Sequence, residues 1–222
     1  MGHVPCLQLL PVDRRNDFGK KMLKVLIGAD FPPNRIIATP LTSIFDAIAE
    51  GLPVNGGGWW KNASSKETTI VKVPQGSPSL DLLCSLLPNS EYVHVGYAGL
   101  TKRGQLKYGL GQLLSIQSAV VYPGIDKAHE ASLTYDGLPA VSCLSVPNFA
   151  CSFSIQDSDI PYDCIDMEVG LAYCAASLYG IRASCIQIVS DSARFDVTSE
   201  ESRSALRTMF RESMERVRQL CL

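Results

Sequence analysis

The chain lacks the features that mark several large classes of protein. It has no run of about 18 apolar residues, so no transmembrane helix is predicted. Its 20 Lys and Arg residues are offset by 22 Asp and Glu residues. This balance argues against a nucleic-acid partner, because binding a phosphate backbone needs a basic surface. Pro5, Gln8 and Pro11 interrupt the apolar stretch near the start, which does not resemble a signal peptide.

Metal-binding and triphosphate-binding signatures are also missing. None of the eight cysteines forms a C-x-x-C pair, and most lie within apolar runs, as small core residues do. The three histidines, His3, His94 and His129, are scattered and form no ligand pair. The glycine-rich segment 56–60 lacks the order of a P-loop. We therefore expect reduced thiols, a cytoplasmic location, no metal and no cofactor.

The apolar and polar segments alternate in a way that predicts an α/β fold. With 46% hydrophobic and 19% charged residues, the 222-residue chain can form one sizeable core. We expect one domain over residues 1–222, with residues 1–22 irregular or peripheral, and a mixed central sheet flanked by helices. Segment 55–60 is expected to be an irregular loop. Expected strands are 23–28, 35–39, 68–73, 91–95, 111–122, 138–144 and 184–189; expected helices are 41–50, 79–87, 166–180 and one from residue 198.

The most informative stretch runs from Asp163 to Gly180. Its apolar residues Met167, Leu171, Cys174 and Leu178 are spaced as on one face of a helix. Gly180 stands where a C-capping glycine belongs. Glu168 then falls in the first helical turn, where the helix dipole favours a carboxylate. The expected strand 184–189 follows and leads into Ser190-Asp191-Ser192.

Ligands of α/β sheets bind at the carboxyl ends of strands, where Glu168 and Asp191 are expected to meet. One acid can hold hydroxyl groups while the other gives a proton, which is the chemistry of cleaving the glycosidic bond of a nucleoside. The alternative is that Glu168 is a surface acid matched to the helix dipole and Asp191 a turn former. The residues by themselves leave both interpretations open.

Three segments resemble the nucleoside phosphorylase family, which includes purine and uridine phosphorylases and methylthioadenosine/S-adenosylhomocysteine nucleosidases. Segment 165–172 has the family's Met-Glu pair opening a helix, followed by a strand ending in Ser-Asp. Segment 93–100, with Gly111-Gln112 after it, resembles the Gly-x-Ala-Gly turn and the Gly-Asp beyond it. Segment 142–149 is similar to the Ser-Gly-Asp-x-Phe segment. The resemblance covers roughly residues 68–222.

The resemblance implies a nucleoside-phosphorylase fold and cleavage of the N-glycosidic bond of a purine-type nucleoside. By the same likeness, Glu168 would accept hydrogen bonds from ribose hydroxyls, and Met167 would pack on the sugar. Phe149 would stack on the base. Asp191 would protonate the departing base, with Ser190 orienting it. Each of these roles is an expectation from the resemblance.

The nucleophile side of the expected site departs from the family pattern. His94 stands where the family pattern has a phosphate-holding arginine. Gln187, in the strand before Ser190-Asp191, stands where the family usually has another arginine. The turn at Gly76 and Ser77 can bind an anion with its amides, or it is a plain strand-to-helix connection. We therefore expect hydrolysis rather than phosphorolysis, with Asp30 offered as the base.

Two further possibilities concern activity and assembly. A non-catalytic nucleoside-binding protein, or a protein of specialised metabolism, is the alternative to a nucleosidase, because the nucleophile side has changed. A homo-oligomer, most simply a dimer, is expected from the resemblance. Trp59 and Trp60 are candidates either to stack on a base or to anchor a subunit interface.

Overall fold

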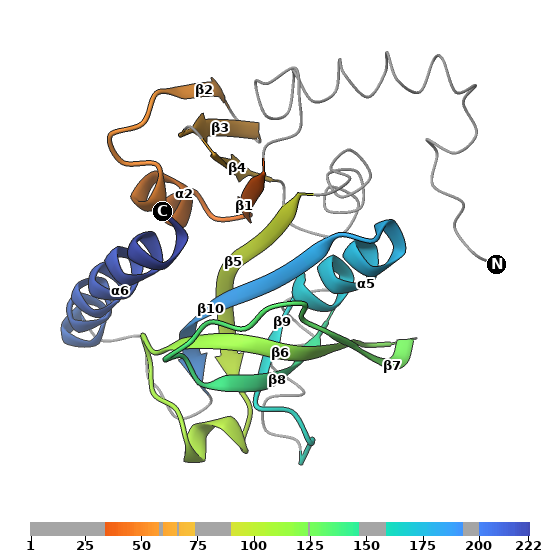
Figure 1. The fold of residues 1–222 in the computed structure, drawn as a ribbon. Coiled ribbons are helices and arrows are strands. Elements are labelled where there is room, and N and C mark those ends of the chain that lie inside the picture. The colour runs from red at the N-terminus through yellow and green to blue at the C-terminus, as the bar shows by residue number, and fades with distance from the viewer. Residues whose placement is uncertain are drawn as a thin grey trace.

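The fold is seen in a computed structural model that describes residues 34–57, 60–65, 67–73, 90–123, 125–146, 159–192 and 200–222. A ten-stranded mixed sheet forms its centre, with helices packed against it (Figure 1). This arrangement confirms the α/β fold with a mixed central sheet. The expected strand 23–28 and helix 79–87 lie outside the described residues.

The elements follow one another in a strand-rich order. The described helices are α2 (Thr42–Ile48), α5 (Val169–Tyr179) and α6 (Glu200–Cys221), with the short 3-10 helix η2 (Gly104–Leu106). The described strands are β1 (Arg35–Thr39), β2 (Val54–Gly57), β3 (Trp60–Ser64), β4 (Thr68–Lys72), β5 (Glu91–Leu100), β6 (Leu113–Val121), β7 (Ile125–Glu130), β8 (Ala140–Ser145), β9 (Cys164–Asp166) and β10 (Arg182–Ser192). No described helix has the length and apolar character needed to cross a membrane.

Part of the sheet closes on itself. The strand order is β10-β6-β8-β9-β5-β1-β4-β3-β2, and β10 also pairs with β5. Strands β5, β9, β8, β6 and β10 therefore form a ring, from which β1, β4, β3 and β2 extend as an open sheet. The long parallel pairing of β10 with β5 is central, because it aligns Gln187 with Gly96 and Asp191 with Gly99.

Helices cover both faces of this sheet (Figure 1). On one face α5 packs through Val169, Ala172 and Tyr173 into the core made with β5, β6, β8 and β10. The Tyr173 hydroxyl donates to the Ile116 carbonyl at 2.6 Å. On the other face, Phe45 of α2 and Val217 of α6 lie in a second buried cluster with β1, β4 and β5. Strands β5 and β10 are covered on both sides, which explains why most of their residues are buried on both faces, residues 183–189 of β10 without interruption.

The structure corrects several sequence-based expectations. Segment 55–60 was expected to be an irregular loop, yet Val54–Gly57 pairs antiparallel with Trp60–Ser64 as a hairpin. All four β2 residues are exposed, so the pairing depends on backbone hydrogen bonds. Because β2 has no alternating apolar pattern, the sequence did not predict it as a strand. Strands β7 and β9 were not expected. Strands β5 and β10 both run further than expected, to Leu100 and Ser192.

Candidate functional site

A cavity of about 190 Å³ lies near the carboxyl ends of β1, β5 and β10. Met167 and Glu168, from the junction of β9 and α5, line it together with Ser190 and Asp191 of β10. The four residues therefore line one cavity; the strand-end rule predicted this meeting for Glu168 and Asp191, and the resemblance implied it for Met167 and Ser190. The remaining described lining residues are Pro40, Leu41, Tyr97, Gly99, Ile165 and Asp166.

Glu168 is positioned by a cap that forms before the helix begins. It occupies the N-cap position of α5 rather than the expected first turn, because the helix begins at Val169. The carboxylate of Asp166 accepts the backbone N–H groups of Glu168 at 3.1 Å and Val169 at 2.7 Å. Gly180 ends α5 in the left-handed conformation with φ of 66°, which confirms the expected C-cap. The cap fixes the direction in which the chain enters α5 at Glu168, which lies at the wall of the cavity.

Asp166 itself is the centre of a buried polar network. Its Oδ1 accepts hydrogen bonds from the Ser145 hydroxyl and from the Cys143 thiol, and its Oδ2 accepts the Gln187 amide at 3.2 Å. Burial raises the pKa of this carboxyl, and the hydrogen bonds from Ser145 and the α5 backbone oppose that shift. Sequence reasoning missed Asp166, although an aspartate three residues before the first helical residue is a capping signal.

A bulge positions Ser190 and Asp191. The pairing of β10 with β5 shifts register between Val189 and Asp191. Such a bulge bends a strand and redirects its side chains. The Ser190 hydroxyl donates to Asp191 Oδ1 and also reaches the Ala98 carbonyl at 3.4 Å. The pair is thus fixed against β5 at the edge of the cavity.

His94 lies beneath the cavity and is not among its lining residues. Its side chain is fully buried in β5, and this burial lowers its pKa from 6.5 to about 4. The imidazole is therefore neutral near pH 7. Its Nδ1 faces the Tyr92 hydroxyl at 3.4 Å. The other expected site residues, Asp30, Gly76, Ser77 and Phe149, lie outside the described residues.

One described part of the cavity wall is formed by the segment that follows β1. Where β1 ends, the chain places Pro40 and Leu41 at the cavity, and neither side chain is an acid or a base. Tyr97 of β5 stands beside them, and its ring stacks on Phe210 of α6 with centroids 5.4 Å apart. No lysine or arginine is present among the described lining residues. Sequence reasoning missed Tyr97 and Leu41, because their meeting depends on how β1 pairs with β5.

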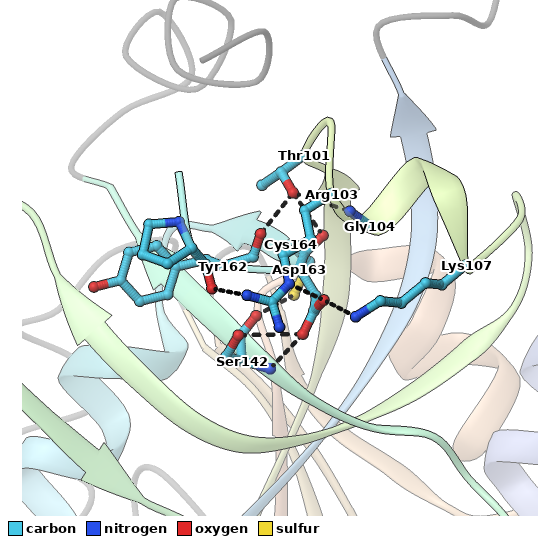
Figure 2. Close-up of polar contacts among 9 residues, drawn as sticks. Thr101, Arg103, Gly104, Lys107, Ser142, Tyr162, Asp163 and Cys164 are labelled. Carbon is cyan, nitrogen blue, oxygen red and sulfur yellow. Dashed lines mark hydrogen bonds and ion pairs between the residues drawn. The ribbon is translucent and has the colours of Figure 1, made fainter. Parts of the chain in front are cut away.

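An ion-pair cluster at the start of β9 supports the segment that leads to Glu168 (Figure 2). Asp163 Oδ1 contacts Lys107 Nζ at 2.9 Å and Arg103 Nε at 3.2 Å. Its Oδ2 accepts the Ser142 backbone N–H and hydroxyl, both at 3.2 Å. The Thr101 hydroxyl donates to the Tyr162 carbonyl at 2.6 Å. These contacts join the β5–β6 connection and β8 to the chain just before β9.

No family model and no curated protein matches the chain. Its fold is similar to solved structures of nucleosidases. One is the nucleosidase MTAN of Chlamydia trachomatis, with a TM-score of 0.60, 14% identity, and coverage of 86% of this chain and 100% of that one. Another is the 5′-methylthioadenosine nucleosidase of Arabidopsis thaliana, with a TM-score of 0.65, 12% identity, and coverage of 85% and 93%.

A third is the AMP nucleosidase of Bacteroides thetaiotaomicron, with a TM-score of 0.60, 14% identity, and coverage of 92% and 97%. Two further Chlamydia trachomatis structures contain MTA and adenine. At these identities the likeness establishes the fold, which is that of the nucleosidases and agrees with the fold expected from the resemblance in sequence.

Proposed function

We propose that this protein cleaves the N-glycosidic bond of a purine-type nucleoside by hydrolysis. The observation that supports this most directly is the single cavity shared by Met167, Glu168, Ser190 and Asp191. A second support is the likeness in fold to nucleosidases whose structures contain MTA or adenine. Fold likeness by itself does not decide function, so the proposal depends on the four residues.

In the proposed reaction, the bond between the ribose C1′ and the base nitrogen breaks with its electrons moving to the base. Asp191 gives its proton to the base, with Ser190 holding the carboxyl in place. Glu168 accepts hydrogen bonds from the ribose hydroxyls, and Met167 packs on the sugar. Water then adds to C1′ and loses a proton, which yields free ribose and free base.

Water is preferred to phosphate as the nucleophile because of the charge at the cavity. Binding a phosphate dianion takes arginine side chains or a set of backbone amides. The described lining residues include neither lysine nor arginine. The base that activates water is proposed to be Asp30, as the sequence suggested. Gly76, Ser77 and Phe149 are proposed to complete the nucleoside site.

The alternative proposal is a non-catalytic nucleoside-binding protein. It is favoured by Pro40 and Leu41, which occupy the end of β1 at the cavity without supplying an acid or a base. A binding protein would keep Glu168 and Met167 for the ribose and need no proton donor.

A panel of nucleosides separates these functions. Adenosine, inosine, methylthioadenosine and AMP are incubated with the full chain, with and without phosphate, and the free base and the released sugar are measured by chromatography. We expect the free base and the corresponding free sugar, with its 5′ substituent retained, at rates that phosphate does not change. Asp191→Asn should lower turnover by about 10²–10⁴-fold while ligand binding remains. Asp136→Asn, which alters an exposed carboxylate, is the matched control.

Each other outcome contradicts a specific part of the proposal. Ribose 1-phosphate as the product would replace hydrolysis by phosphorolysis. Full activity of a folded Asp191→Asn variant would remove Asp191 from the reaction. Ligand binding without free base from any nucleoside would favour the non-catalytic alternative.

A further inference from the structure

Three buried ligand-type side chains meet at the cavity, two of them among its lining residues. They are His94 from the middle of β5, Asp166 from the end of β9, and Glu168 from the N-cap of α5. A ring nitrogen of His94 and one carboxylate oxygen from each acid all lie within 4.8 Å of one another. The three residues are 0%, 5% and 8% exposed. Buried titratable groups from three separate elements rarely converge without a shared role.

Two unpartnered polar atoms point to a ligand at the same place. In the part of the chain that the structure describes, His94 Nε2 and Gln187 Oε1 are buried and have no hydrogen-bond partner. Both atoms face Gly96, since a Cβ added there would lie 3.1 Å from His94 Nε2 and 2.9 Å from Gln187 Oε1. A buried polar atom without a partner destabilises the folded protein, so such atoms need an explanation.

The surrounding contacts hold these atoms in fixed directions. The Tyr92 hydroxyl lies 3.4 Å from His94 Nδ1, which leaves Nε2 directed toward Gly96. Gln187 donates a hydrogen bond from Nε2 to Asp166 Oδ2 at 3.2 Å, which leaves Gln187 Oε1 available as an acceptor. Ser145 and the α5 backbone hold Asp166 in turn. In metal sites of proteins, hydrogen bonds of this kind to the ligating side chains and their neighbours orient the ligands.

The chemistry of the donor set indicates which ion would bind. An imidazole nitrogen, carboxylate oxygens and an amide oxygen together suit a divalent first-row transition metal. Magnesium and calcium prefer oxygen ligands alone, and soft ions prefer thiolates. We propose that His94 Nε2, Gln187 Oε1 and the Glu168 carboxylate bind one Mn²⁺- or Zn²⁺-type ion, with Asp166 as the adjoining carboxylate. Such an ion fixes Glu168 and places a Lewis acid at the wall of the cavity.

The proposal is tested by metal binding to the full chain without any nucleoside, so it stands or falls independently of the nucleosidase reaction. The protein is treated with EDTA, dialysed and titrated with Mn²⁺, followed by electron paramagnetic resonance and calorimetry. Mn²⁺ is the main probe because the chain has eight cysteines, and thiolates select Zn²⁺. We expect one Mn²⁺ per chain, with Mg²⁺ binding more weakly, and a rise in Tm with Mn²⁺ concentration.

Two variants and a control locate the site. His94→Gln removes a ligand, whereas Gly96→Ala keeps every proposed ligand and fills the space between His94 and Gln187. Each should weaken Mn²⁺ binding by at least about tenfold. His129→Gln, which changes a histidine of β7, should bind as the wild type does. Equal binding by all variants, or much less than one Mn²⁺ per wild-type chain, would show an adventitious ion only and overturn the proposal. If both variants fail to fold, an unchanged wild-type Tm with Mn²⁺ overturns it equally.

Discussion

At the scale of single residues, the position of Glu168 depends on its neighbour Asp166. The Asp166 carboxylate caps α5 and is itself held by Ser145, Cys143 and Gln187. Glu168 is thus placed at the cavity by a network with a structural role of its own. A carboxylate on such a rigid support loses little freedom when it binds a ligand, which favours a role in recognition.

Replacement of Glu168 tests whether this carboxylate binds the sugar. Glu168→Gln should weaken binding of ribonucleosides much more than binding of their 2′-deoxy analogues, because a charge-assisted hydrogen bond is about twice as strong as a neutral one. The measurement is calorimetric titration with both kinds of nucleoside. Glu130→Gln, an exposed glutamate of β7, should leave both affinities unchanged. Equal losses for the two sugars would assign Glu168 to packing or metal binding only.

At the scale of secondary-structure elements, β9 is short and depends on its connections. It has only three residues, Cys164–Asp166, and pairs with β5 and β8. Asp163 adds ion pairs to Lys107 and Arg103 just before it (Figure 2). The site segment 166–168 therefore takes its position from contacts on three sides.

Removal of the Asp163 charge should loosen this element. Burial acts to raise the pKa of Asp163, but hydrogen bonds from Lys107 and Ser142 and the Lys107 charge outweigh it, and the pKa is lowered overall. Asp163→Asn should lower the free energy of unfolding by about 2 kcal/mol at neutral pH, because hydrogen bonds to a charged group are lost. The measurement is urea denaturation followed over a range of pH.

The pH dependence of this loss has a definite sign. Because the folded pKa lies below the unfolded value of 3.8, the stabilisation is complete above that pH and lost as pH falls through the folded pKa. The difference between Asp163→Asn and wild type should therefore shrink below about pH 4. Asp159→Asn, an exposed neighbour, should show little difference at any pH. A difference that is constant down to pH 2 would mean that the ion pairs do not contribute.

At the scale of the whole molecule, the sheet ends at strand β2 in the part of the chain that the structure describes. Strand β2 is last in the strand order, and its four residues are exposed, including Val54 with half of its surface accessible. Edge strands of this kind readily pair with another chain unless they are covered. Trp59 and Trp60 belong to the same part of the sequence, although their side chains lie outside the described residues.

We predict a homodimer that uses the region of the β2–β3 hairpin. Sedimentation equilibrium at micromolar concentration should give twice the 24.1 kDa mass of one chain. Replacing Trp59 and Trp60 by alanine should shift the mass toward that of the single chain, because aromatic residues are enriched in such interfaces. Leu106→Ala, at an exposed apolar residue of η2, should leave the mass unchanged. A monomer for the wild-type chain would contradict the prediction.

Local sequence determined those features that depend on neighbouring residues. The helix after Asp166, its end at Gly180, and the strand that leads to Ser190 and Asp191 could all be predicted. Their signals are helical spacing, a left-handed capping glycine and a β-branched run, each of which acts within a few residues. The meeting of Glu168 with Asp191 followed from the rule that strand ends gather ligands. The roles of Asp30, Gly76, Ser77 and Phe149 stay predictions.

Tertiary structure alone decided which distant residues share the site. The ring closes because β10 pairs with both β5 and β6, and that register brings Gln187 beside Gly96 and near His94. Pro40, Leu41 and Tyr97 reach the cavity through the pairing of β1 with β5. The hairpin at 54–64 forms by backbone pairing with exposed side chains. Register between strands distant in sequence depends on the packing of the whole sheet, so no local pattern in this chain could have specified it.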